Sequence, residues 1–151
     1  FLAVNTQVNA GNLGFNTVSK YRRSDLLCVS ENELRLEVRS RRRDIKDIML
    51  TVAEELHCDR MVITRGTSGS VCYSKEEGFS EIPAFGTRVV DRVGAGDAVF
   101  SVAALCVAQN APMEIVGFIG NAVGAEAVAT IGHRTSTQKV RLIRHMESLL
   151  K

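Results

Sequence analysis

The sequence has 151 residues, of which 45% are hydrophobic, and a formal net charge of +2 at pH 7. This length and composition fit one globular domain with a buried core, and so small a net charge gives no reason to expect nucleic acid as a partner. No apolar run is long enough to cross a bilayer, so we expect a cytoplasmic protein with no membrane partner. The 4 cysteines and 3 histidines lack metal-ligand spacing, and the cysteines are expected to be reduced core residues.

An apolar run at residues 1–6 predicts a buried strand at the very start of the chain. A first residue that lies within a strand indicates a fragment of a longer protein. The following loop is rich in amides and glycines, which either bind sugar hydroxyl groups or simply form turns, and the sequence leaves both open. These loop residues are Asn5, Gln7, Asn9, Gly11, Asn12, Gly14 and Asn16.

The next elements alternate between strand and helix. Residues 25–30 predict a compact strand, and Ser30 with Glu33 forms a capping box that starts a helix at residue 31. An amphipathic helix over residues 44–57 and a strand over 60–64 follow. The turn after Thr64 contains Gly66 and Gly69, which either let the backbone approach a ligand or make a hairpin turn. Two further β segments are expected over residues 69–74 and 79–84.

Residues 94–96 form the central feature, a turn of Gly94, Ala95 and Gly96 between the apolar run 87–90 and a helix expected over 98–109. A turn with so few side chains leaves backbone N–H groups at a helix start, where the helix dipole favours an anion. A carboxylate at Asp97 suits a group that takes a proton from an attacking hydroxyl. The alternative is a glycine turn with Asp97 as helix N-cap. A dinucleotide turn is set aside because Val99 occupies the third glycine position.

Residues 91–100, Asp-Arg-Val-Gly-Ala-Gly-Asp-Ala-Val-Phe, resemble the second signature of the ribokinase-like (PfkB) carbohydrate kinases. The resemblance implies that Gly94, Ala95 and Gly96 form an anion hole and that Asp97 is the catalytic base. The sequence departs from the family at Arg92, where threonine is usual.

The same resemblance extends to other segments. The segment from Ser30 to Glu33 resembles the family's Asn-x-x-Glu motif, with Ser30 in place of the usual Asn. The resemblance implies a role for Glu33 near Mg²⁺, with pure helix capping as the alternative. The segment that follows residue 63 resembles the strand and turn along the nucleotide, which implies cofactor-binding roles for Thr64, Gly66 and Gly69. In the helix expected over residues 113–131, Asn121 resembles an Asn of the nucleobase pocket, although close helix packing explains most small residues there. A monovalent cation beside the loop at 132–137 is a further candidate.

The resemblance implies an α/β protein with a three-layer αβα ribokinase-like fold, whose mostly parallel sheet is flanked by helices. Residues 1–151 would be its C-terminal, nucleotide-binding half. The implied function is phosphoryl transfer from ATP, with Mg²⁺, to a hydroxyl of a sugar or sugar phosphate, in the general manner of heptose-phosphate kinases. The partners would be that small molecule and the missing N-terminal half, and an exposed sheet edge would favour a homodimer. The alternative is a catalytically lapsed nucleotide-binding or regulatory module, which the departures from the family pattern at Arg92 and Ser30 support.

Overall fold

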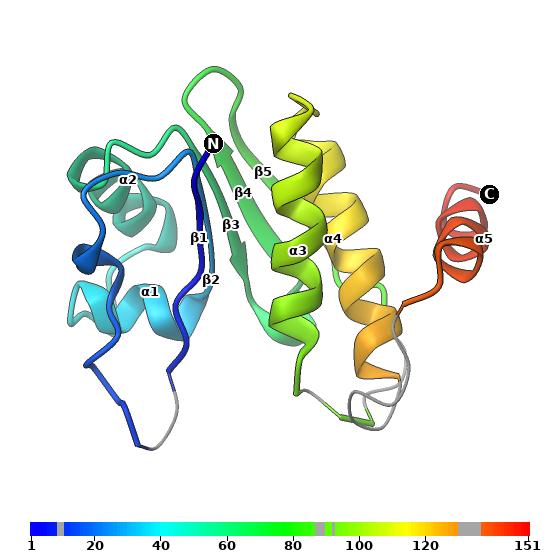
Figure 1. Cartoon of the computed structure of the whole chain (residues 1–151), viewed down its shortest axis with the longest axis horizontal. Coiled ribbons are helices and arrows are strands. Elements are labelled where there is room, and N and C mark those ends of the chain that lie inside the picture. The colour runs from blue at the N-terminus through cyan, green and yellow to red at the C-terminus, as the bar shows by residue number, and fades with distance from the viewer. Residues whose placement is uncertain (9–10, 87–89, 92, 130–136) are drawn as a thin grey trace.

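The computed structural model describes residues 1–8, 11–86, 90–91, 93–129 and 137–151. Its centre is a five-stranded sheet in the order β1-β2-β3-β4-β5, so that spatial order follows chain order (Figure 1). The strands are β1 (Ala3–Val4), β2 (Leu26–Ser30), β3 (Arg60–Thr64), β4 (Ser70–Ser74) and β5 (Gly78–Ile82).

The sheet is mixed, and the length of each connection decides the strand directions. β1, β2 and β3 are parallel, and the connection from β2 to β3 carries two helices, as a parallel crossover requires. β3, β4 and β5 are antiparallel neighbours joined by short turns. The carboxyl ends of β1, β2 and β3 therefore meet at one edge of the sheet.

Helices cover both faces of this sheet (Figure 1). α1 (Glu31–Glu37) and α2 (Ile45–Glu55) lie on one face, and α3 (Ala95–Ala108) and α4 (Met113–Val128) lie on the other. α5 (Lys139–Leu149) lies outside α4. This arrangement confirms the expected three-layer α/β fold, but the sheet is mixed and not mostly parallel, because only the pairs β1–β2 and β2–β3 are parallel. Among the described residues, no helix is both long enough and apolar enough to span a bilayer.

Two hydrophobic cores hold the layers together. The first includes the apolar stripe of α2, namely Ile45, Ile48, Met49, Val52 and Ala53, packed against β2 and β3. The second includes Leu26, Cys28, Val62 and Cys72 of the sheet with Val99, Ala103 and Val116 of the α3–α4 layer. Alternate residues of β2 thus enter opposite cores, as the two-residue period of a strand requires.

Small residues let α4 approach its neighbours closely. A Cβ added to Gly120 or Gly124 would lie 3.3 Å or 3.2 Å from a methyl group of Val99 on α3. A Cβ added to Gly117 would lie 2.6 Å from Sγ of Cys72 in the sheet. The expectation that the small residues of this helix serve packing is confirmed at these three positions.

The predicted run before the central turn falls largely on residues 87–89, outside the described residues, as do Asn9, Arg92 and most of the loop at 132–137. The described part of that segment is tied to the end of α4. Val90 and Asp91 both donate their backbone N–H to the carbonyl of Val128, at 2.7 Å and 3.1 Å. This anchors the chain just before Gly94.

Candidate active site

The start of α3 is shaped by Gly94, which serves as its N-cap with a φ of 79°. This left-handed conformation suits glycine, because a side chain would raise its energy. No side chain caps the helix, and the first N–H groups of a helix have no partner within it. Ala95, Gly96 and Asp97 occupy that first turn, and Gly96 has open space where a Cβ would stand. The first turn of α3 therefore carries both free backbone N–H groups and the carboxylate of Asp97.

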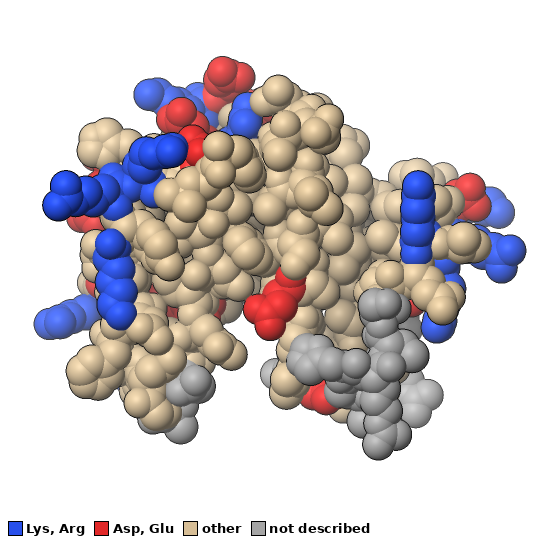
Figure 2. Space-filling model, viewed as in Figure 1, with Lys and Arg blue, Asp and Glu red and all other residues tan. Residues whose placement is uncertain are grey.

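A cavity of about 140 Å³ lies between this helix start and the carboxyl ends of the three parallel strands. Figure 2 shows a hollow in the surface at the bottom of the view, at the edge of the sheet where the parallel strands end. Lys and Arg side chains gather at the two sides of the molecule in the same view. The cavity-lining residues come from four segments distant in sequence. They are Asn5, Thr6, Gln7, Cys28, Val29, Ser30, Glu33, Thr64, Gly94, Gly96 and Asp97.

The structure thus brings together five of the predicted site residues, namely Glu33, Thr64, Gly94, Gly96 and Asp97, in one cavity. Three others, Gly66, Gly69 and Asn121, do not line it. Ala95 lies within the same helix turn without lining the cavity.

Glu33 forms the predicted capping box with Ser30. Its Oε2 accepts hydrogen bonds from the N–H and the hydroxyl of Ser30, both at 2.7 Å, while the Glu33 N–H donates to the Ser30 hydroxyl at 3.3 Å. Its Oε1 accepts the N–H of Val8 at 3.1 Å. One carboxylate therefore starts α1 and fixes the segment that follows β1, so the capping role is confirmed.

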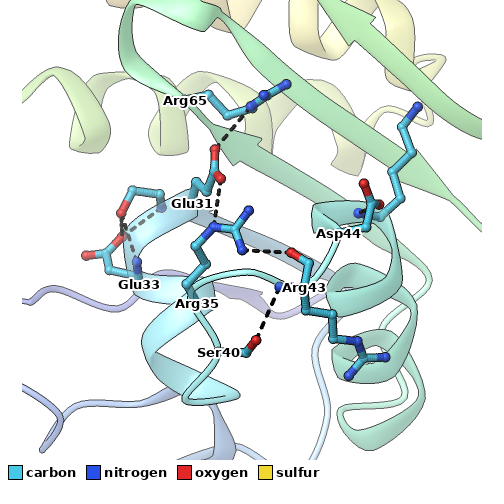
Figure 3. A network of polar contacts seen from close by, with 9 residues as sticks. Glu31, Glu33, Arg35, Ser40, Arg43, Asp44 and Arg65 are labelled. Atoms are coloured by element: carbon cyan, nitrogen blue, oxygen red, sulfur yellow. Dashed lines mark hydrogen bonds and ion pairs between the residues drawn. The ribbon is translucent and has the colours of Figure 1, made fainter.

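An ion-pair network lies beside the capping box (Figure 3). Glu31 accepts from Nε of Arg35 at 2.8 Å and from Nε of Arg65 at 3.1 Å. Partial burial works to raise the pKa of Glu31, but hydrogen bonds and charge from the two arginines outweigh it and hold that pKa below its usual value. Since Arg65 follows β3, the pair ties the start of α1 to the end of the neighbouring strand.

The turn between β3 and β4 is a hairpin connection that contains a short 3₁₀ helix, Gly66–Ser68. Gly69 has a φ of 81°, and a Cβ there would lie 2.0 Å from the carbonyl oxygen of Ile82. Gly66 also has a positive φ, 58°, but open space around it. The glycine at 69 is thus required by the close approach of two backbone segments, which is the hairpin interpretation of this turn.

Asn121 bonds to the protein itself. Its Nδ2 donates to the carbonyl of Ile82 at 3.0 Å and to that of Pro83 at 2.8 Å. These bonds satisfy two carbonyl groups at the end of β5 and join α4 to the sheet. The Asn121 side chain therefore has a structural role in joining α4 to the end of β5.

Sequence reasoning singled out Asn5 and Gln7 only as part of the loop and did not mark Thr6, Cys28 or Val29 as cavity residues. The sequence signal for these three residues was weak, because only their position near the ends of strands indicated that they would line a cavity. Cys28 is buried, and burial, with smaller effects from Cys72 and Glu33, raises the pKa of its thiol to about 12. It therefore forms an uncharged part of the cavity wall at neutral pH.

The residues present suit a hard divalent cation. Glu33 and Asp97 place two carboxylates on one cavity, and Ser30 and Thr64 add hydroxyl groups. Mg²⁺ in phosphate-transfer sites is bound through one or two carboxylates, substrate phosphates and retained waters, not by a complete protein cage. Among the described residues, no group of three or more His, Cys, Asp or Glu side chains that could hold a metal occurs.

Comparisons with known proteins identify the family of the chain. Residues 12–140 match the model of the pfkB family carbohydrate kinases. The Haemophilus ducreyi "Bifunctional protein HldE" is 27% identical over 106 residues, which cover 69% of this chain and 22% of that protein.

Two solved structures share the fold. Escherichia coli phosphofructokinase-2, solved with substrates and products, matches with a TM-score of 0.79 and 18% identity over 99% of this chain and 47% of its own. The Methanocaldococcus jannaschii nucleoside kinase, described as an archaeal member of the ribokinase family, matches with a TM-score of 0.66 and 24% identity over 83% of this chain and 40% of its own. The chain thus spans less than half the length of these relatives.

Proposed function

The chain belongs to the pfkB family of carbohydrate kinases, and from this premise we propose that it transfers the γ-phosphoryl group of ATP to a hydroxyl of a sugar or sugar phosphate. The observation that carries the proposal is the shared cavity of Gly94, Gly96, Asp97 and Glu33. We also propose that residues 1–151 supply the nucleotide site, the anion hole and the catalytic base, and that further residues of the acceptor site lie outside them, because the chain covers only 40–47% of the two kinases described above.

The proposed reaction uses Asp97 as general base. Its carboxylate accepts the proton of the acceptor hydroxyl, whose oxygen forms a bond to the γ-phosphorus as the bond to the bridging oxygen of ADP breaks. Asp97 is exposed at the cavity, in the first turn of α3, so both the acceptor and the proton can reach it.

The start of α3 supports the proposed role of an anion hole. Backbone N–H groups of residues 95–97 lie in the first turn of α3, and in the proposed reaction they stabilise negative charge on the transferring group without reorganisation. A bound Mg²⁺ would neutralise charge on the phosphate oxygens. Glu33 and Asp97 are the carboxylates that would hold it, directly or through water. Thr64 lies at the end of β3, on the side of the cavity nearest the turn at residues 66–69, where the nucleotide is proposed to bind.

Replacing Asp97→Asn in the full-length protein tests the proposal. Loss of a general base lowers kcat by about 10²- to 10⁴-fold, while the KM for ATP should change little. Glu114→Gln, the same chemical change in the first turn of α4, serves as control because this residue is exposed and outside the cavity. Turnover would be followed as ADP formation across a panel of sugars and sugar phosphates.

Two results would contradict the proposal. Near-normal turnover of Asp97→Asn would refute the base assignment. Stabilisation by ATP or ADP without phosphoryl transfer to any sugar would instead indicate a nucleotide-binding module, and at about one hundred times the dissociation constant that stabilisation is roughly 2.7 kcal/mol.

A further inference from the structure

Thr6 is a buried polar residue at the cavity wall. Its exposed fraction is 8%, and it lines the cavity directly after β1. Its hydroxyl has no hydrogen-bond partner among the described residues, and its oxygen is not one of the fully enclosed atoms that lack a partner, so it is open to the cavity. A hydroxyl group that is open to a cavity and has no partner in the protein forms its hydrogen bonds with water or with a ligand in that cavity. The position of this hydroxyl at a cavity wall points to a partner inside the cavity.

Strand order decides which substrate Thr6 faces. β1 is the edge of the three parallel strands that frame the cavity, and β3 is two strands away, which is about 10 Å at the usual strand spacing. Thr64 is the last residue of β3 and the proposed nucleotide turn follows it, whereas Thr6 lies just after β1. In an in-line transfer the donor and acceptor approach phosphorus from opposite sides, so the β1 end is the acceptor side.

The residues on either side of Thr6 are uncharged, and the charged residues that line the cavity, Glu33 and Asp97, are both acidic. Asn5 and Gln7 flank Thr6 and line the same cavity, and their side-chain amides also lack partners among the described residues. No Lys or Arg occurs among the described residues that line the cavity. Hydroxyl and amide groups without a cation suit neutral hydroxyl groups better than a phosphate.

Resting on the proposed function, we propose that Thr6 is a specificity-determining residue that hydrogen-bonds a neutral hydroxyl of the sugar acceptor, beside the hydroxyl that Asp97 deprotonates. Any phosphate group of the acceptor then lies away from this wall. Glu33 orients the wall through its bond to the N–H of Val8.

The test compares Thr6→Val, which is similar in shape but lacks the hydroxyl, with Thr6→Ser, which keeps it. The full-length protein would be assayed with glucose, mannose, ribose, fructose and their terminal phosphates, and the best acceptor of the wild type used for all variants. Thr6→Val should raise the KM for that acceptor by about two- to tenfold, the factor contributed by one neutral hydrogen bond. The KM for ATP should stay constant, and Thr6→Ser should stay close to wild type. Thr17→Val, at a half-buried threonine outside the cavity-lining set, is the control.

Stability gives a readout that does not depend on the acceptor. Because the Thr6 hydroxyl has no described partner in the protein, Thr6→Val should leave the melting temperature unchanged or raise it. A lowered melting temperature would show that the hydroxyl stabilises the fold and would overturn the inference. An unchanged KM for the acceptor, or a rise in the KM for ATP alone, would also overturn it. Absence of turnover with every sugar would count against the proposed function itself, and the inference would fall with it.

Discussion

Val8 donates its backbone N–H to Oε1 of Glu33 at 3.1 Å, and this bond joins the segment after β1 to the first turn of α1. The other oxygen of the same carboxylate holds Ser30 at the end of β2. Two neighbouring strand ends are thus fixed to each other by one side chain. Since both ends line the cavity, the geometry of the proposed site depends on a group first predicted as a helix cap.

Replacing Glu33→Ala should lower the free energy of unfolding by about 1 kcal/mol or more, because the capping box and the bond to Val8 are lost together. Urea denaturation would measure this change. Glu33→Gln keeps the side-chain size and one acceptor oxygen, enough for the bonds from Ser30 or for the bond from Val8, and removes the charge that would hold Mg²⁺. If its turnover depends on Mg²⁺ concentration as in the wild type, Glu33 is a cap without a metal role; a shift to higher Mg²⁺ supports the proposed role.

Gly69→Ala should be strongly destabilising, by about 3 kcal/mol or more, because the new Cβ would collide with the carbonyl oxygen of Ile82 at a positive φ. Gly66→Ala is the matched control in the same turn. It meets no neighbour and suffers only the left-handed backbone penalty of about 1–2 kcal/mol. Equal losses in thermal or urea denaturation would contradict the close approach of β5 to this turn.

Asn121→Ala should lower stability by about 1–3 kcal/mol, because the carbonyl groups of Ile82 and Pro83 lose their donor. Asn121→Asp should be at least as harmful, since a carboxylate cannot donate to a carbonyl. Asn32→Ala, at an exposed asparagine of α1, is the control. Calorimetric melting of the three variants would measure the effect, and an unchanged melting temperature for Asn121→Ala would contradict a structural role.

Acid should destabilise the protein partly through Glu31. Its pKa is lower in the folded state than in the unfolded chain, so the unfolded state binds a proton first as pH falls. The stabilisation from the ion pairs of Glu31 with Arg35 and Arg65 is therefore present above the pKa of the unfolded state, about 4.3 for glutamate. It is lost as pH falls through the lower pKa of the folded state. Urea denaturation between about pH 7 and pH 3 should show a shallower pH dependence for Glu31→Gln than for the wild type. Parallel pH curves for the two proteins would contradict the contribution of the Arg35 and Arg65 pairs.

Local features of the site could be predicted from sequence because they depend on neighbours along the chain. The capping box of Ser30 and Glu33 spans three residues, and the left-handed Gly94 lies directly before the helix that it starts. Helix stripes such as that of α2 follow from a period of 3.6 residues. These signals placed Asp97 at a helix start and indicated the layered α/β fold.

Long-range packing decided the rest. The sequence left Gly69 between a ligand turn and a hairpin, and only the approach of Ile82 from another strand explains it. The bonds of Asn121 reach across 39 and 38 residues, which no local pattern specifies. Thr6 carries no motif, and its place in the cavity follows from the pairing of β1 beside β2. The sequence by itself determined which helices and strands form, and it placed the Asp97 carboxylate at a helix start. The order of the strands in the sheet determined which other side chains line the same cavity. Only the tertiary structure decides this, because burial and strand pairing act between segments that are distant in sequence.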